Sequence, residues 1–179
     1  PSSVTSFGIN IFKAVKILEI KGDLKSIPNK LFEECVSLKI LTIPSSVTTI
    51  GDNAFNECNF LKFLIISSKE ALNEDIAFHG CSIGNNSFDG CSKLERISVP
   101  SSLTLIDDDA FNDCSSLMLV TLPHPMEMIG KKAFNSCTNL TQISIPSSVK
   151  IIGDECFSAT GLVSFTFPPS ITKVSRYMF

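Results

Sequence analysis

The sequence predicts a repeat solenoid of the α/β type, predominantly β, in which about 7.5 units of 23 residues stack along one axis. The first sign is a recurring motif, since IPSSVTTIGDNAFNEC at 43–58 returns as VPSSLTLIDDDAFNDC at 99–114. The second is a phenylalanine ladder with intervals of 20, 23, 33, 23, 23, 23 and 22 residues, formed by Phe12, Phe32, Phe55, Phe88, Phe111, Phe134, Phe157 and Phe179. A unit this short cannot bury its own apolar side, so its neighbours must stack on it and share one core.

Each unit contains a strand pattern, in which apolar residues alternate with others and then meet a proline. The clearest copies are at 38–44, 94–100, 117–123 and 140–146. A period of two is that of a β-strand, and proline ends it because proline cannot donate to a β-ladder. Aliphatic residues follow three and six positions after the proline, as at Val47 and Ile50. We therefore expect parallel strands about 4.8 Å apart, with the apolar side chains in internal columns.

A bend follows the second aliphatic residue, and most units place glycine there. The glycines are Gly8, Gly51, Gly84, Gly130 and Gly153. Pro28, Asp107 and Ser175 occupy the same position in other units. Because proline fixes φ near −65°, we interpret the position as a permissive bend and not as one that requires a positive φ.

Cysteine recurs three residues after the ladder phenylalanine, at Cys35, Cys58, Cys91, Cys114 and Cys137. Free cysteine is among the most buried residue types, so we expect these thiols to be reduced and to belong to the structural core. Disulfides between neighbouring units are an alternative, although parallel side chains rarely offer the required dihedral. A metal site is a third, but the two histidines are not placed to complete a zinc set.

Composition and charge exclude several classes of function. The chain is 44% hydrophobic and 18% charged, and its net charge of −3 argues against general nucleic-acid binding. No apolar run is long enough to span a membrane. The sequence holds no nucleophile–base constellation and no Gly-rich phosphate loop. We therefore expect no catalytic site, cofactor, metal or small-molecule substrate.

Three consecutive carboxylates, at 107–109, form a candidate cation site. Consecutive carboxylates on an extended segment point in different directions, however, and the aligned positions of the next units are Lys131 and Lys132, then Asp154 and Glu155. The alternative is a solvated face on which acids and bases alternate from unit to unit and reinforce the register.

The skeleton IPxSVxxIGxxAFxxCxxLxxIxIP resembles the BspA-type leucine-rich repeat, and it covers essentially the whole chain. The resemblance implies a curved solenoid with a parallel sheet on its concave face and irregular or strand-like segments opposite. The family includes surface and adhesive proteins of mucosal bacteria and protists. We interpret residues 1–179 as a single solenoid, excerpted from a longer array. Three departures are a shortened first interval, an irregular insertion at about 69–80, and Thr160 in place of cysteine.

Function in a solenoid depends on residues that the repeat does not dictate, so the outward positions of the concave strands are the candidates. One column holds Lys16, Lys39 and Lys62, followed by Glu95 and Met118. Stacked ammonium groups repel one another and favour an acidic partner, unless they simply splay into water. The adjacent column holds Ile17, Ile40, Phe63, Arg96, Leu119 and Gln142, with Ile65 beside it. Such an apolar row indicates a contact surface, with Phe63 as anchor, or ordinary sheet-face residues.

The sequence thus predicts a non-enzymatic protein–protein interaction module with an unidentified protein partner, serving cell-surface adhesion or host recognition. An intracellular scaffold and a targeting or regulatory segment of a larger enzyme are the alternatives, and the compartment is not indicated. The insertion at about 69–80 either contributes to recognition of a partner or is extra sequence without a function that the fold tolerates. Two sequons, which begin at Asn85 and Asn139, permit glycosylation only if the protein is secreted.

Overall fold

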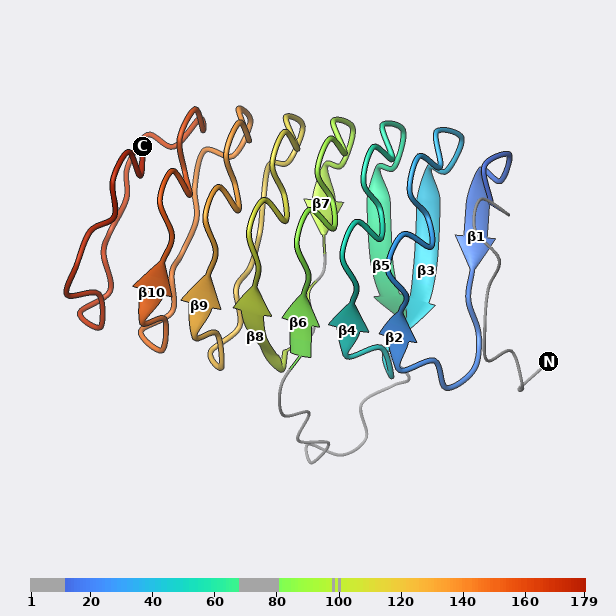
Figure 1. Cartoon of the computed structure of the whole chain (residues 1–179), viewed down its shortest axis with the longest axis horizontal. Coiled ribbons are helices and arrows are strands. Elements are labelled where there is room, and N and C mark those ends of the chain that lie inside the picture. Colours follow the sequence, from blue (N-terminus) through green and yellow to red (C-terminus); the bar gives the residue numbers. More distant parts are fainter. Residues whose placement is uncertain (1–11, 68–80, 98, 100) are drawn as a thin grey trace.

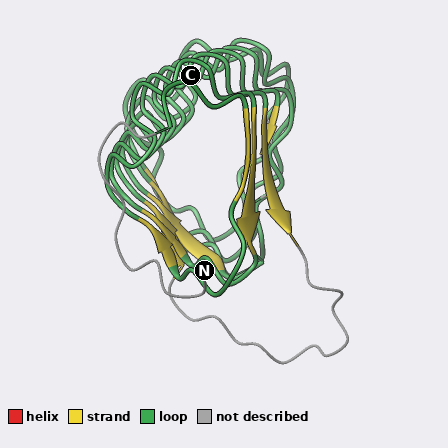
Figure 2. Ribbon diagram, turned by 90° about the vertical axis from the view of Figure 1, so that its right-hand side faces the viewer, coloured by secondary structure: helices red, strands yellow, loops and turns green. Residues whose placement is uncertain are grey.

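Successive repeat units lie side by side along the long axis of the molecule, each forming one turn of the chain (Figure 1). The computed structural model describes residues 12–67, 81–97, 99 and 101–179. Seen along the axis, each turn encloses a common interior, with strands on two opposite sides and a loop that joins them (Figure 2). This arrangement follows from the repeat, because each turn has one apolar side to share with its neighbours.

The first sheet is parallel and has the strand order β1-β3-β5-β7. Its strands are β1 (Ile17–Glu19), β3 (Ile40–Pro44), β5 (Phe63–Ser67) and β7 (Arg96–Ile97). In β3, Leu41 and Ile43 are buried whereas Ile40 and Thr42 are only half-buried, as the period of two predicts. Beyond β7 the same path continues through isolated bridges, Arg96 with Leu119 and Thr121 with Ser144.

The second sheet lies on the opposite side and has the order β10-β9-β8-β6-β4-β2. Its strands are β2 (Ser26–Ile27), β4 (Thr49–Ile50), β6 (Cys81–Ile83), β8 (Leu103–Ile106), β9 (Met128–Ile129) and β10 (Ile151–Ile152). The second aliphatic residue of each unit ends its strand and is buried, as Ile106 and Ile129 illustrate. The molecule is therefore a parallel β-solenoid. The described residues contain no helix, so the α/β label is not confirmed, and the count of about 7.5 units stays a prediction.

The phenylalanine ladder forms the centre of the core. From Phe32 to Phe157, neighbouring ring centroids lie 4.9–5.8 Å apart with interplanar angles of 4–9°. These six rings are completely buried. At the two ends of the ladder, Phe12 is half-buried and Phe179 is 56% exposed. Phe179 stacks on Phe157 at 6.1 Å, but a neighbouring turn covers it on one side only.

The loop around each ladder phenylalanine is held by a second backbone ladder. The amide of Phe55 donates to the carbonyl of Ser87 at 2.7 Å, and that of Phe111 donates to Ala133 at 2.8 Å. Residues two before and two after the phenylalanine adopt a left-handed φ, for example Asn53 at 54°. Most of these residues are not glycine, so this conformation could not be recognised from residue type.

The glycine at the bend is needed for a close approach between backbones. Gly130 has no positive φ, in agreement with the sequence analysis. A Cβ at this position would stand 2.5 Å from the carbonyl carbon of Asp107 in the preceding unit, however. The bend is therefore not permissive at every unit, because the backbones of two successive units leave no room for a side chain.

The cysteines line the core beside the phenylalanines. Six are buried and free, at positions 35, 58, 91, 114, 137 and 156. The thiol of Cys114 donates to the carbonyl oxygen of Phe88 at 3.1 Å, and Cys137 repeats the contact with Phe111 at 3.2 Å. Burial raises the pKa of the Cys114 thiol well above its usual range, which keeps the donated proton on sulfur. These thiols therefore act as hydrogen-bond donors between units.

Candidate protein-binding surface

The residues predicted for recognition lie together on the outward face of the first sheet, which we call the groove face. The register pairs Ile17 with Ile40, Ile40 with Phe63, and Phe63 with Arg96. A bridge then pairs Arg96 with Leu119. Residues up to 102 positions apart in sequence (17 to 119) thus form one continuous row. The row is accessible, since Ile17 is 68% exposed and Leu119 is 51% exposed.

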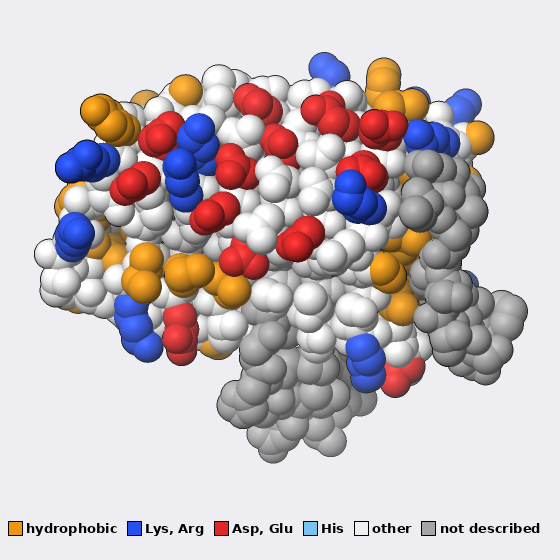
Figure 3. Space-filling view, viewed as in Figure 1, with side chains coloured by type: hydrophobic (Ala, Val, Ile, Leu, Met, Phe, Trp, Pro, Cys, Tyr) orange, Lys and Arg blue, Asp and Glu red, His pale blue; other side chains and the backbone are white. Residues whose placement is uncertain are grey.

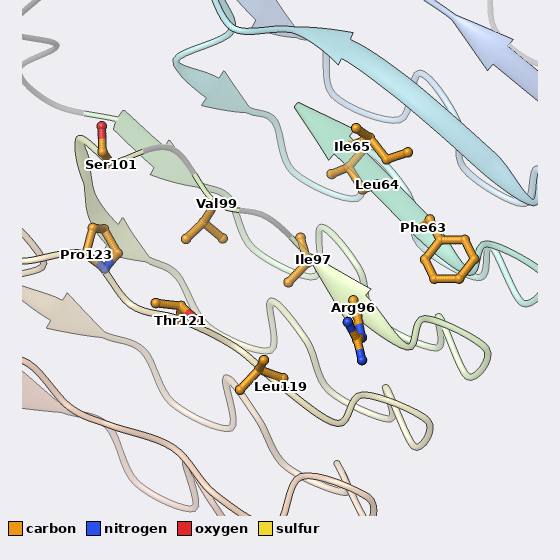
Figure 4. A pocket seen from close by; sticks show the side chains of 10 residues that line it. All are labelled: Phe63, Leu64, Ile65, Arg96, Ile97, Val99, Ser101, Leu119, Thr121 and Pro123. Atoms are coloured by element: carbon orange, nitrogen blue, oxygen red, sulfur yellow. The ribbon is translucent and has the colours of Figure 1, made fainter. Parts of the chain in front are cut away.

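A hollow of about 560 Å³ opens on the groove face across β5, β7 and the segment that follows (Figure 4). Its lining is mostly apolar and consists of Phe63, Leu64, Ile65, Arg96, Ile97, Val99, Ser101, Leu119, Thr121 and Pro123. Ile65, on the next outward position of β5, is 46% exposed. A hollow of this volume falls in the range of ligand-binding sites in proteins.

Arg96 lies between Phe63 and Leu119 in this lining (Figure 4). Its side chain is exposed. In the described part of the chain, its guanidinium makes no ion pair and no side-chain hydrogen bond. An arginine with five free donors beside apolar walls can receive a planar anion, such as a carboxylate.

The predicted lysine column borders the groove face. The amide of Lys39 donates to the carbonyl of Lys16, and that of Lys62 donates to Lys39, which stacks the three residues in line. Glu95 continues the column and its carboxylate pairs with the ammonium of Lys62 at 3.0 Å. This pair reduces the expected repulsion. Lys16 and Lys39 form no ion pair among the described residues, so the border stays positive.

A second hollow, of about 460 Å³, follows toward the C-terminus on the same side. Gln142, the last residue of the predicted row, lies in its lining together with Ser144, Ser164 and Thr166. The bridge between Thr121 and Ser144 connects this region to the first hollow. The groove face therefore changes along the axis from apolar and basic to hydroxyl-rich.

Comparison with known proteins establishes the family. The sequence model of the BspA type leucine rich repeat region, in six copies, matches residues 1–84 and 81–179. The chain belongs to this family. No curated protein matches it.

Several solved structures share the fold of this leucine-rich repeat chain. A leucine rich cell surface protein from Faecalibacterium prausnitzii is 30% identical with a TM-score of 0.76, over 87% of this chain and 40% of that one. A leucine rich repeat protein from T. pallidum is 29% identical with a TM-score of 0.57, over 87% of this chain and 60% of that one. The pneumococcal vaccine antigen PcpA, at 24% identity and a TM-score of 0.65 over 85% and 40% of the two chains, shows the fold alone. The leucine-rich repeat chain thus spans about half the length of these proteins.

Six residues of the first hollow were not predicted from the sequence: Leu64, Ile97, Val99, Ser101, Thr121 and Pro123. Thr121 could have been found, because it lies two positions after Leu119 and a strand returns to the same face every second residue. Met118, which was predicted, is 45% exposed beside Leu119 but does not line the hollow.

The second sheet presents a different surface, which is acidic toward the loops (Figure 3). A row of hydrophobic side chains lies over β8, β9 and β10 in the same view. The register assigns this row to Leu105, Met128 and Ile151. The repeat pattern does not reveal this row, because the aligned residues of earlier units, Thr49 and Ser82, are polar.

The acidic triplet at 107–109 lies on a surface where the charge alternates from unit to unit. The carboxylate of Asp108 accepts the backbone N–H of Lys131 at 2.7 Å, and Lys132 pairs with Glu155 at 3.6 Å, so this surface stacks acid on base. In the part of the chain that the structure describes, no group of three or more acidic, histidine or cysteine side chains could hold a metal ion.

The insertion at about 69–80 lies outside the described residues. Within the described ranges, no helix has the length and apolarity that crossing a bilayer demands.

Proposed function

We propose that the chain is a non-enzymatic protein-binding module that recognises its partner with the groove face. All 179 residues act as one solenoid of about 7.5 units, and the partner covers the row that runs from Ile17 to Gln142. The Faecalibacterium relative is a cell surface protein, which favours a role in cell-surface adhesion or host recognition.

The observation that carries this proposal is the coincidence of the hollow with the predicted row. Phe63, Ile65, Arg96 and Leu119 all line the first hollow, and none of them is required for the core. Aromatic and arginine side chains are the types most enriched among residues that dominate protein–protein binding. A sheet face held by backbone ladders also loses little entropy when a partner docks, so modest contacts suffice for binding.

The proposal is tested by photocrosslinking in cells that express the protein. A benzoylphenylalanine in place of Phe63 should give a discrete crosslinked protein, and the same residue in place of Thr49, which is partly exposed on the second sheet, should not. Affinity for the identified partner should then fall by tenfold or more in Phe63→Ala and also in Lys39→Glu. Equal crosslinking from both positions, or unchanged affinity of both variants, contradicts the proposal.

An intracellular scaffold is the second candidate, and the buried free cysteines favour it. Burial raises the pKa of the Cys91 and Cys114 thiols, which keeps them unreactive but does not require an oxidising compartment. The groove face serves the same purpose in either compartment. The identity of the crosslinked protein separates the two candidates.

A further inference from the structure

Arg96 is a single charged side chain set into an apolar row. Phe63 flanks it on β5 and Leu119 flanks it on the following unit, and the three side chains line one hollow (Figure 4). We propose that the hollow binds an extended protein segment in which one Asp or Glu is flanked by apolar residues, with the carboxylate on Arg96. This inference rests on the proposed function and names the chemistry of its partner.

The charge of the groove face favours an anionic group. The whole chain carries a net charge of −3. On and beside this face, however, the acids are already paired, Glu95 with Lys62 at 3.0 Å and Glu19 with Lys21 at 3.3 Å. Lys16, Lys39 and Arg96 are cations without an ion pair among the described residues. An incoming carboxylate therefore meets attraction and, as far as the described residues of this face extend, no unpaired acid.

The apolar lining favours a protein segment over a polyanion. A nucleic acid carries a charge at every phosphate and needs a cation at regular intervals along its path. Among the described residues that line the hollow, Arg96 is the one charged residue, and Phe63, Ile65, Ile97 and Leu119 surround it. A segment with one carboxylate among apolar side chains matches this lining, since the carboxylate would pair with the guanidinium of Arg96 and the apolar side chains would contact the apolar walls.

The spacing of the three residues sets the pattern of the segment. Phe63 and Leu119 lie two strand positions apart, which is roughly 10 Å at the usual strand separation. An extended chain advances about 3.3 Å per residue, so roughly three residues cross this distance. The apolar residues of the partner should therefore lie one or two positions from the acid, on either side.

The test is a selection of random 12-residue peptides displayed on phage against the 179-residue chain. Enriched peptides should carry Asp or Glu with apolar residues within two positions. The affinity of an enriched peptide, measured by fluorescence polarisation, should fall about 10–100-fold in Arg96→Gln, which removes a charged hydrogen-bonding partner. Replacement of the peptide's acid by its amide should have no further effect in that variant. Arg176→Gln, the same change at an exposed arginine of another unit, is the control and should leave affinity unchanged.

Each contrary outcome has a distinct meaning. Peptides that lose affinity with Phe63→Ala but respond neither to Arg96→Gln nor to loss of their acid overturn this inference and leave the proposed function standing. Selection of no peptide at all overturns the inference, while the crosslinking experiment decides the proposed function separately. Competition by a single-stranded DNA oligomer that depends on Arg96 would assign the site to nucleic acid and overturn it as well.

Discussion

Truncation of one ring in the phenylalanine ladder, Phe111→Ala, should strongly destabilise the chain. Phe111 is completely buried and its ring lies 5.1 Å from that of Phe88 and 5.3 Å from that of Phe134. Removal of a fully buried phenylalanine side chain costs about 3–5 kcal/mol, because burial is lost and a cavity remains. Two stacked neighbours hold the cavity open, so we expect a value of about 4 kcal/mol.

Urea unfolding followed by far-ultraviolet circular dichroism measures this cost, since the chain has no tryptophan and one tyrosine. With a slope of about 2 kcal/mol per M, a loss of about 4 kcal/mol lowers the midpoint by about 2 M. Phe60→Ala is the matched control. Phe60 is 52% exposed and lies off the ladder, so its truncation should change stability by no more than about 0.5 kcal/mol.

A double-mutant cycle then separates a continuous ladder from eight independent rings. Phe88→Ala combined with Phe111→Ala should deviate from additivity by about 0.5–3 kcal/mol, because the two rings are in contact. Phe32→Ala combined with Phe111→Ala should be additive, since two rings lie between them. A midpoint for Phe111→Ala equal to that of Phe60→Ala, or equal coupling in both pairs, refutes the idea that the units share one aromatic core.

Two further substitutions test the loops around the ladder. Asp89 accepts a hydrogen bond from Asn112 at 2.9 Å, and burial raises the pKa of its carboxyl, with Asp113 nearby adding to the effect. The folded chain therefore holds the Asp89 proton more tightly than the unfolded chain does. The resulting contribution to stability is fully present below the ordinary pKa of the carboxyl and is lost as pH rises through the raised pKa. Asp89→Asn should therefore raise the Tm at pH 7 by about 2–4 °C, corresponding to about 1 kcal/mol, and the gain should vanish in acid; a gain that persists at low pH contradicts this reasoning. Ala159→Gly should add about 0.5–1 kcal/mol in urea unfolding, since Ala159 has a φ of 54° and Gly90 occupies the equivalent position; a loss of stability would show that the left-handed φ is not strained there.

The sequence was sufficient to predict the core and the rows of the groove face. The interval between units and the residue type at each position together determine which side chain stacks on which. In a parallel sheet to which each unit contributes one strand, no other pairing of neighbouring strands is possible. The interval of 33 residues around the insertion did not disturb this, since Phe63 still pairs with Arg96. The insertion therefore changes the length of its unit but not the register of the described strands on either side of it.

Features that depend on the approach of two backbones could not be predicted. Proline at position 28 correctly excluded a positive φ at the bend, but nothing in one unit reveals how near the next unit lies, so the need for Gly130 was missed. The left-handed φ at Glu57 and Asp113 was missed for the same reason. Inter-unit hydrogen bonds impose this conformation against the residues' own preference, because tertiary contacts outweigh local propensity.

Arg96 occupies an outward position of the first sheet, where the solenoid fold does not dictate the residue type. The fold requires apolar residues at the inward positions of the first sheet, and Ile97 and Leu64 satisfy this requirement beside it. The outward position needs only a residue that tolerates a strand, and its neighbours in the row are Phe63 and Leu119. A cation there gains no ion pair among the described residues and interrupts an apolar row that would otherwise pack against itself. The solenoid does not account for this cation, whereas the proposed partner does, because a group that forms no ion pair in the described chain would gain one once a carboxylate covers it.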